Sequence, residues 1–130
     1  MRNIFILLSF LFLQQIAFSQ SNAKNKAKFP KYQAVGTFHN GLAKVKFNNK
    51  WGFIDTLGVE VIPPRYHEVG DFNDGLARVR VNEKWGMVDT QGNVIIKPTF
   101  EWIYDFEGDR AKVLLDNKTY YMNRKGQRVE

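Results

Sequence analysis

The chain contains no cysteine, and this absence excludes several kinds of site. Its 130 residues include two histidines, His39 and His67, but no Cys. A disulfide framework, a thiolate zinc site, a cysteine nucleophile and a lipid anchor on cysteine are therefore ruled out. His39 and His67 lack the spacing of metal ligands and are interpreted as surface residues. We expect neither a metal nor a cofactor.

The chain also lacks a hydrophobic run long enough to cross a membrane. Residues 4–13 are strongly apolar at every position except Ser9. Gln14 and Gln15 then interrupt the run well short of the roughly 20 apolar residues that a spanning helix requires. An uncleaved membrane anchor is therefore the less favoured interpretation of this segment.

The same segment has the three parts of a secretory signal peptide. Arg2 gives it a positive start, the apolar run follows, and Ala17 and Ser19 are small residues placed just before a cleavage site. We predict that residues 1–19 are a signal peptide cleaved after Ser19. The mature protein is then exported to the periplasm or the extracellular space, with no transmembrane span. The polar and basic residues 20–28 are predicted to form a flexible lead.

The excess of positive charge is moderate. The full chain has a formal net charge of +6, and removal of residues 1–19 takes away Arg2 and no acidic residue, which leaves +5. This charge allows weak attraction to anionic surfaces but does not amount to a polybasic tract. For an exported protein we expect a partner protein or an anionic envelope polymer, with self-association as a further option, and no nucleic acid.

The sequence from residue 29 onward repeats with a period of 34 residues. Residues 38–71 and 72–105 are identical at 15 of 34 aligned positions. Residues 106–130 form a less regular third copy, and residues 29–37 form an N-terminal half-unit that we expect to complete the stack that the last copy leaves open. Such a period indicates stacked units that bury a face against each other.

Period-two alternation indicates that the units are built from strands. In residues 41–47, Ala43, Val45 and Phe47 share one face, while Lys44 and Lys46 share the other. The helical pattern of a tetratricopeptide repeat, which also has a period of 34, is missing. The chain therefore belongs to the all-β class.

Turn chemistry divides each unit further. An Asp or Asn followed three residues later by Gly is typical of a type I turn, and it occurs at residues 55–58, 89–92 and 123–126. We expect Pro64 and Pro98 to end the strand after the turn, because proline cannot donate to a central ladder. Each unit is thus predicted to be a three-stranded antiparallel meander, and the units form a small stacked array rather than a closed propeller.

These features together resemble the WG repeat family. The matching text is NGLAKVKFNNKWGFIDTLGVEVIPPRYHEVGDF at residues 40–72 and DGLARVRVNEKWGMVDTQGNVIIKPTFEWIYDF at residues 74–106. The resemblance implies a β-rich repeat module that is often found in bacterial secreted or envelope proteins, with no catalytic activity and no defined ligand. The third copy has Thr119-Tyr120 where the family pattern has Trp-Gly.

The repeated motif positions are interpreted as structural. Trp fills space between units, Gly allows a neighbouring backbone to approach, and Asp and Gly form the turn. The alternative interpretations are an aromatic platform for a sugar at Trp and acid–base chemistry at Asp, but we expect a catalytic role for none of these positions. The positions are Trp51, Gly52, Asp55, Gly58, Trp85, Gly86, Asp89 and Gly92.

Candidate ligand-binding residues lie elsewhere. The 34-residue period should align Lys44, Arg78 and Lys112 as a basic stripe, with Lys46 and Arg80 as a second row that Leu114 interrupts. An ordinary wet sheet face is the alternative interpretation of these charges. Two further aromatic residues are not required by the repeat, namely Trp102 and Tyr104.

The sequence thus predicts a non-catalytic exported module for binding or scaffolding. An enzyme or accessory domain that acts on envelope glycans is one rival, and a purely structural spacer is another. An enzyme would need a polar cluster outside the repeat, and the non-repeated candidates here are aromatic.

Overall fold

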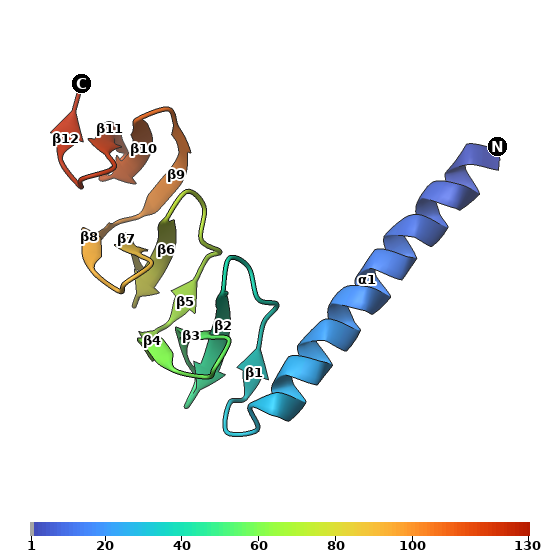
Figure 1. The fold of residues 1–130 in the computed structure, drawn as a ribbon. Helices are drawn as coiled ribbons and strands as arrows, with labels where there is room; N and C mark the ends of the chain where they lie inside the picture. The colour runs from blue at the N-terminus through green and yellow to red at the C-terminus, as the bar shows by residue number, and fades with distance from the viewer. Residues whose placement is uncertain (1) are drawn as a thin grey trace.

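The computed structural model describes residues 2–130, with side chains from Ser9 onward, and contains one long helix and three small sheets (Figure 1). The helix, α1, spans Arg2–Lys28. Sheet A consists of β1 (Ala34–Val35), β2 (Leu42–Phe47), β3 (Lys50–Asp55) and β4 (Glu60–Tyr66). Sheet B consists of β5 (Glu68–Val69), β6 (Leu76–Val81), β7 (Lys84–Asp89) and β8 (Val94–Phe100). Sheet C consists of β9 (Trp102–Glu107), β10 (Arg110–Leu115), β11 (Lys118–Asn123) and β12 (Arg128–Val129).

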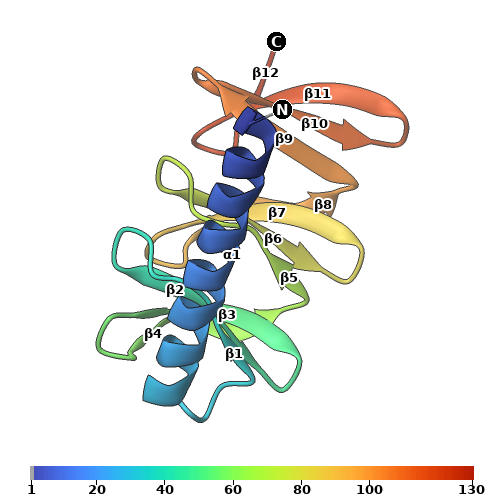
Figure 2. The same cartoon turned by 90° about the vertical axis from the view of Figure 1, so that its right-hand side faces the viewer.

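Each sheet is an antiparallel meander in chain order, and the three sheets lie one above another (Figure 2). The prediction of tandem antiparallel β-repeats is confirmed, although each sheet has four strands rather than three. A single residue joins one sheet to the next, His67 between β4 and β5 and Glu101 between β8 and β9. The sheets therefore begin about four residues earlier than the predicted units, which started at Phe72 and Phe106.

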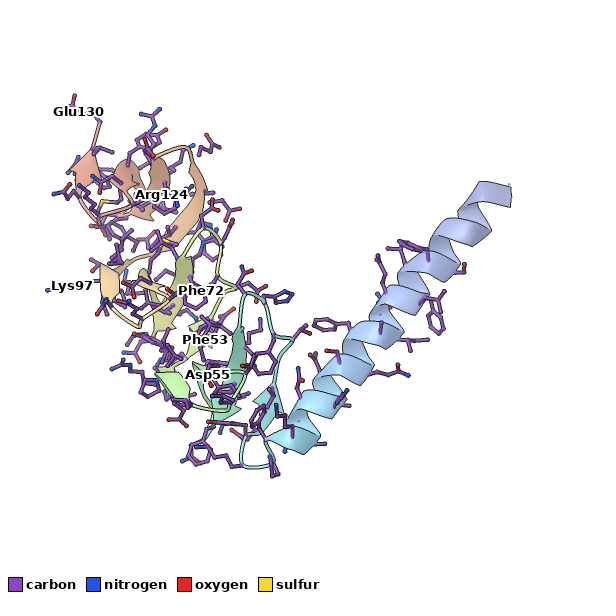
Figure 3. The ribbon with its side chains drawn as sticks, in the orientation of Figure 1. Phe53, Asp55, Phe72, Lys97, Arg124 and Glu130 are labelled. Atoms are coloured by element: carbon purple, nitrogen blue, oxygen red, sulfur yellow. The ribbon has the colours of Figure 1, made fainter. Side chains whose placement is uncertain are left out.

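The hydrophobic core lies between the sheets. The face of sheet A that carries Phe53 packs against the face of sheet B that carries Ala77 and Val79. Phe53 and Phe72 lie inside this layer, with ring centroids 4.7 Å apart (Figure 3). The opposite face of sheet B, through Met87, packs in the same way against sheet C. Sheet B is therefore packed on both faces, as stacked repeat units require.

The N-terminal half-unit does not close the array. Residues 34 and 35 form β1, the first strand of sheet A, whereas β12 belongs to sheet C at the other end of the stack (Figure 1). Tyr32 and Val35 instead cover the free face of sheet A, where they pack with Val45 and Ile54. The half-unit is thus a cap on the first sheet.

The prolines do not end their strands. β4 continues through Pro63 and Pro64, and β8 continues through Pro98. Both are edge strands, and the pairing register of each shifts at these prolines. Because proline has no backbone N–H, it is tolerated at such a bulge, where that N–H is not needed for pairing with the neighbouring strand.

Residues 20–28 are helical, not the flexible lead that the sequence predicted. They form the last turns of α1, and two polar side chains fix them to the start of sheet A. Asn25 Nδ2 donates to Gly36 O at 2.8 Å, and Thr37 Oγ1 donates to Asn22 Oδ1 at 3.0 Å. From there α1 diverges from the stack (Figure 1). Within the described residues, no helix combines the length and apolar character that a membrane span demands.

Candidate binding surface

The glycine of each Trp-Gly pair lies where another strand comes unusually close. A Cβ added to Gly52 would lie 2.2 Å from Ile62 O, and one added to Gly86 would lie 2.3 Å from Ile96 O. These are the points at which β4 and β8 bulge through their prolines. Trp-Gly on one strand and Ile-x-Pro on the next are therefore two halves of one backbone contact.

The tryptophans of the motif are half-buried at the sheet interfaces. Trp51 contacts the core between sheets A and B, and Trp85 contacts the core between sheets B and C. A basic residue of the neighbouring strand covers each indole, with Lys46 Nζ 5.6 Å from the Trp51 ring centroid and the Arg80 guanidinium carbon 5.9 Å from that of Trp85. The second basic row thus lies against the motif tryptophans.

The Asp-x-x-Gly turns repeat the same hydrogen bonds in all three units. Asp89 Oδ1 accepts from the backbone N–H groups of Gln91 and Asn93, each at 2.9 Å. Asp55 and Asn123 accept the equivalent pairs at the same distance. A carboxylate and an amide oxygen perform this role equally, so the turn does not require an acid.

Hydrogen bonding also sets the ionisation of Asp89. Burial raises its pKa, but hydrogen bonds from the side chain and backbone of Asn93 and from the backbones of Gln91 and Gly92 outweigh burial and lower the pKa below the ordinary aspartate value. The ionised carboxylate is therefore the form that the turn stabilises.

The turn glycines also join one unit to the preceding one. A Cβ on Gly126 would lie 2.0 Å from Ile95 O, and one on Gly92 would lie 3.3 Å from Ile62 Cγ1. Gly58 contacts the ring of Phe29 in the same manner. All three have positive φ, between 77° and 87°, which glycine adopts without strain. Each turn therefore docks on the unit before it.

Two of the three residues of the predicted basic stripe form ion pairs with acids of the following unit. Lys44 Nζ lies 3.4 Å from Asp71 Oδ1, and Arg78 pairs with Asp105 in the same relation one unit later. Both acids lie 27 residues after their bases and belong to the next sheet, Asp71 in the connection between β5 and β6 and Asp105 within β9. Lys112 has no ion pair among the described residues and lies 5.8 Å from the ring centroid of Tyr104.

The two non-repeated aromatics both lie on β9, where Arg78 of sheet B contacts the Trp102 ring and lines one hollow with Tyr104. Trp102 and Tyr104 are 36% and 46% exposed. The Trp102 ring packs edge-on against Trp85 at 5.2 Å, and the Arg78 guanidinium carbon lies 5.3 Å from its centroid. We call this group the B–C aromatic cluster. It comprises Arg78, Arg80, Trp85, Trp102, Tyr104 and Lys112.

The structure therefore brings together five of the seven predicted ligand-binding residues. Lys44 and Lys46 remain apart in sheet A, where Lys44 borders a groove of about 380 Å³ between α1 and the sheet. Sequence reasoning missed Arg110 and Tyr121, which adjoin the cluster on sheet C. The signal was available, because they replace the apolar Leu76 and Met87 of the preceding unit.

The polar groups of the chain do not form a metal site where the structure describes them. From Ser9 to Glu130, no three His, Asp or Glu side chains gather in a manner that would hold a metal ion. A linked polar group lies at the N-terminal cap, where Glu60 accepts from Tyr32 Oη at 2.9 Å and pairs with Lys31 at 3.0 Å. The hydrogen bond from Lys31, and to a smaller extent the one from Tyr32, lowers the pKa of Glu60 below the ordinary glutamate value.

Comparison with known proteins gives one match. No curated protein and no solved structure matches the chain. The family model described as WG containing repeat matches three times, at residues 22–51, 51–85 and 85–118, and so covers most of the sheet stack. The second match runs from β3 of sheet A to the start of β7 in sheet B, and the third runs from β7 to the start of β11 in sheet C. The chain belongs to the WG repeat family.

Proposed function

We propose that this protein is a non-catalytic, exported binding module, and that the B–C aromatic cluster is its main contact with a partner protein or an anionic envelope polymer. The observation that carries the proposal is the exposure of Trp102 and Tyr104 beside Arg78. Elsewhere the motif aromatics are half-buried between sheets, where packing accounts for them.

The chemistry of the cluster favours binding over catalysis. Exposed aromatic rings provide contact area at low conformational cost. Arg78 and Arg80 are paired with Asp105 and Glu68, so Lys112 beside Tyr104 is the cation of the cluster that adds attraction for acidic groups. The two motif aspartates, Asp55 and Asp89, have one carboxylate oxygen engaged by backbone N–H groups. Their arrangement is that of turn formers rather than of an acid–base pair.

A binding experiment with one matched control tests this proposal. The full-length gene is expressed, the protein is purified in its processed form, and its sedimentation with bacterial envelope fractions is measured. Trp102→Ala should weaken binding roughly tenfold or more, because it removes an exposed aromatic anchor. Phe47→Ala, at a position that is 40% exposed but in sheet A, should leave binding unchanged. Equal binding by both variants would reject the cluster as the contact surface.

Export is tested on the same sample. The apolar run after Arg2 and the small residues before the proposed cut support cleavage after Ser19. Intact mass spectrometry of the purified protein should then identify Gln20 as the first residue. A mass that includes Arg2 would contradict this part of the proposal.

A further inference from the structure

The outer face of sheet C has a hollow that the repeat does not require. Its volume is about 120 Å³, and it opens on the side of sheet C that faces away from sheet B. On sheets A and B the same face is covered by the next sheet. Within residues 2–130, no strand covers it on sheet C. The hollow is lined by Tyr104, Asp105, Glu107, Arg110, Lys112 and Tyr121.

The residues of this face differ from those that stack on another sheet. Arg110 takes the place of Leu42 and Leu76, and Tyr121 takes the place of Phe53 and Met87. A face with charged groups at these positions does not suit burial under a further apolar sheet. It suits a polar ligand that leaves the charges partly hydrated.

Arg110 is held in position before any ligand arrives. Its guanidinium carbon lies 4.4 Å from the ring centroid of Tyr121, and Nη1 donates to Glu130 O at 3.0 Å. Lys112 lies directly opposite Tyr121 in the strand register. Two cations from one strand, two residues apart, therefore project from the same face.

The charge balance of the hollow favours an anion. Asp105 is paired with Arg78, Arg110 already contacts Glu130 O, and Lys112 forms no ion pair among the described residues. Glu107 is the remaining acid in the lining. Lys112 is therefore the cation of this lining that is left for an anionic ligand, with Arg110 fixed two residues before it on the same strand.

We infer that this hollow binds a uronic acid unit of an acidic polysaccharide. The sugar carboxylate pairs with Arg110 and Lys112, and the apolar face of the ring rests on the exposed ring of Tyr104. Pockets that enclose a whole drug-sized ligand measure about 300–1,000 Å³, so this smaller hollow fits one unit of a chain that continues past it. The inference rests on the proposed function and specifies the partner on the sheet C side of the aromatic cluster.

The test uses the full-length protein in its processed form and a trimer of galacturonic acid as the probe. Binding is measured by calorimetry, and the contact site is mapped by amide chemical shifts. The same trimer with its carboxylates methyl-esterified keeps the sugar rings and removes the charge. Arg110→Gln/Lys112→Gln removes both cations from exposed positions. Lys84→Gln/Lys97→Gln is the charge-matched control on sheet B, where Lys97 points away from the stack (Figure 3).

The inference predicts that the acid trimer binds and shifts the amides of β10 and β11. It also predicts that Arg110→Gln/Lys112→Gln weakens this binding roughly tenfold or more, while the control and wild type agree. No binding of the acid trimer, equal binding of its methyl ester, or full binding by Arg110→Gln/Lys112→Gln would overturn it. Tighter binding of a poly-glutamate peptide would overturn the assignment to a sugar.

The two proposals fail in different ways. Envelope binding that depends on Trp102 while the acid trimer does not bind would reject the uronate site alone. Trimer binding that depends on Arg110 and Lys112, without any effect of Trp102→Ala on envelope binding, would reject the aromatic cluster alone.

Discussion

Sheets A and B differ from sheet C at the positions that give the family its name. In sheets A and B a tryptophan lies at the interface with the next sheet, and a glycine accepts the bulge of the fourth strand. In sheet C these positions hold Thr119 and Tyr120. The fourth strand of sheet C, β12, pairs only with Tyr121 and Met122. Residue 120 therefore has no bulged strand against it, and the position accepts the side chain of Tyr120 in place of glycine.

The difference indicates what the Trp-Gly motif does. The motif is present where a unit must accept both a bulged strand within its own sheet and a second sheet on its face. It is lost where the described chain supplies neither. The exposed aromatic and cationic residues are concentrated around sheet C, where stacking no longer constrains them. Under the proposed function, the regular sheets A and B supply the architecture and sheet C supplies the recognition surface.

The largest effect is expected from Gly86→Ala. The new Cβ would lie 2.3 Å from Ile96 O, a backbone atom that cannot move without disrupting β8. We expect a loss of about 3 kcal/mol or more in the free energy of unfolding, measured by urea denaturation. Gly70→Ala is the control, because its Cβ would meet its nearest neighbour, Arg78 Cβ, at 3.7 Å. Equal stability of the two variants would contradict the close-approach explanation.

Trp85→Ala should cost about 2–3 kcal/mol. This is less than the full cost for a buried tryptophan, because the indole is only half-buried between sheets B and C. A double-mutant cycle with Trp102→Ala should give a coupling of about 0.5–1.5 kcal/mol from their edge-on contact. Thr119→Ala, at the equivalent position of sheet C, should change stability little. A cost at Thr119 as large as that at Trp85 would remove the contrast between the sheets.

Asp89→Ala should cost about 1–2 kcal/mol, since the backbone N–H groups of Gln91 and Asn93 lose their acceptor. Asp89→Asn should restore most of this stability, because Asn123 makes the same two bonds in sheet C. Thermal unfolding of both variants measures the difference. If Asn were as damaging as Ala, the role of Asp89 would depend on its charge and not on turn formation.

The ion pairs between units should contribute less. Lys44→Gln removes a partner of Asp71 in an exposed pair and should cost about 0.2–1 kcal/mol at low salt. The effect should fall as salt screens the pair, which urea denaturation at two ionic strengths detects. A cost that does not change with salt would mean that Lys44 acts by packing.

The smallest effect concerns pH at the N-terminal cap. Glu60 has a lowered pKa in the folded protein, so its contribution is present above the ordinary glutamate pKa of about 4.5 and is lost as the pH falls through the lower folded value. Wild type should therefore lose more stability than Glu60→Gln over this acidic range, by melting curves recorded at each pH. Parallel curves would show that the contacts of Glu60 with Lys31 and Tyr32 do not favour the ionised form.

Much of the fold followed from the sequence, for physical reasons that can be traced. The 34-residue period reflects the stacking of equivalent sheets, and the alternation in residues 41–47 places Ala43 and Val45 on a buried face. Each turn follows from an Asp or Asn with a Gly three residues later. The strands through Pro64 and Pro98 were missed, because a proline excludes a central ladder but not a bulged edge strand. Helix in residues 20–28 was missed because its anchors, Gly36 and Thr37, follow later in the chain.

The candidate site was predicted only in part. Trp102 and Tyr104 stood out because the repeat does not require them, and this criterion also applies to Arg110 and Tyr121. The sequence could not show that Lys44 and Arg78 are paired with acids of the following unit, since such pairs depend on how successive sheets stack. The repeat period shows which side chains are aligned, but it does not show which of them already form ion pairs.

The most direct test of the division between architecture and recognition compares the basic residues of the first and last sheets. Lys44→Gln/Lys46→Gln and Arg110→Gln/Lys112→Gln change the charge equally, and sedimentation with one envelope fraction measures binding of both. We predict that the sheet C pair loses binding roughly tenfold or more, while the sheet A pair retains it. Equal loss in both variants would show that charge alone drives binding, and loss only in the sheet A variant would place recognition on the regular repeats.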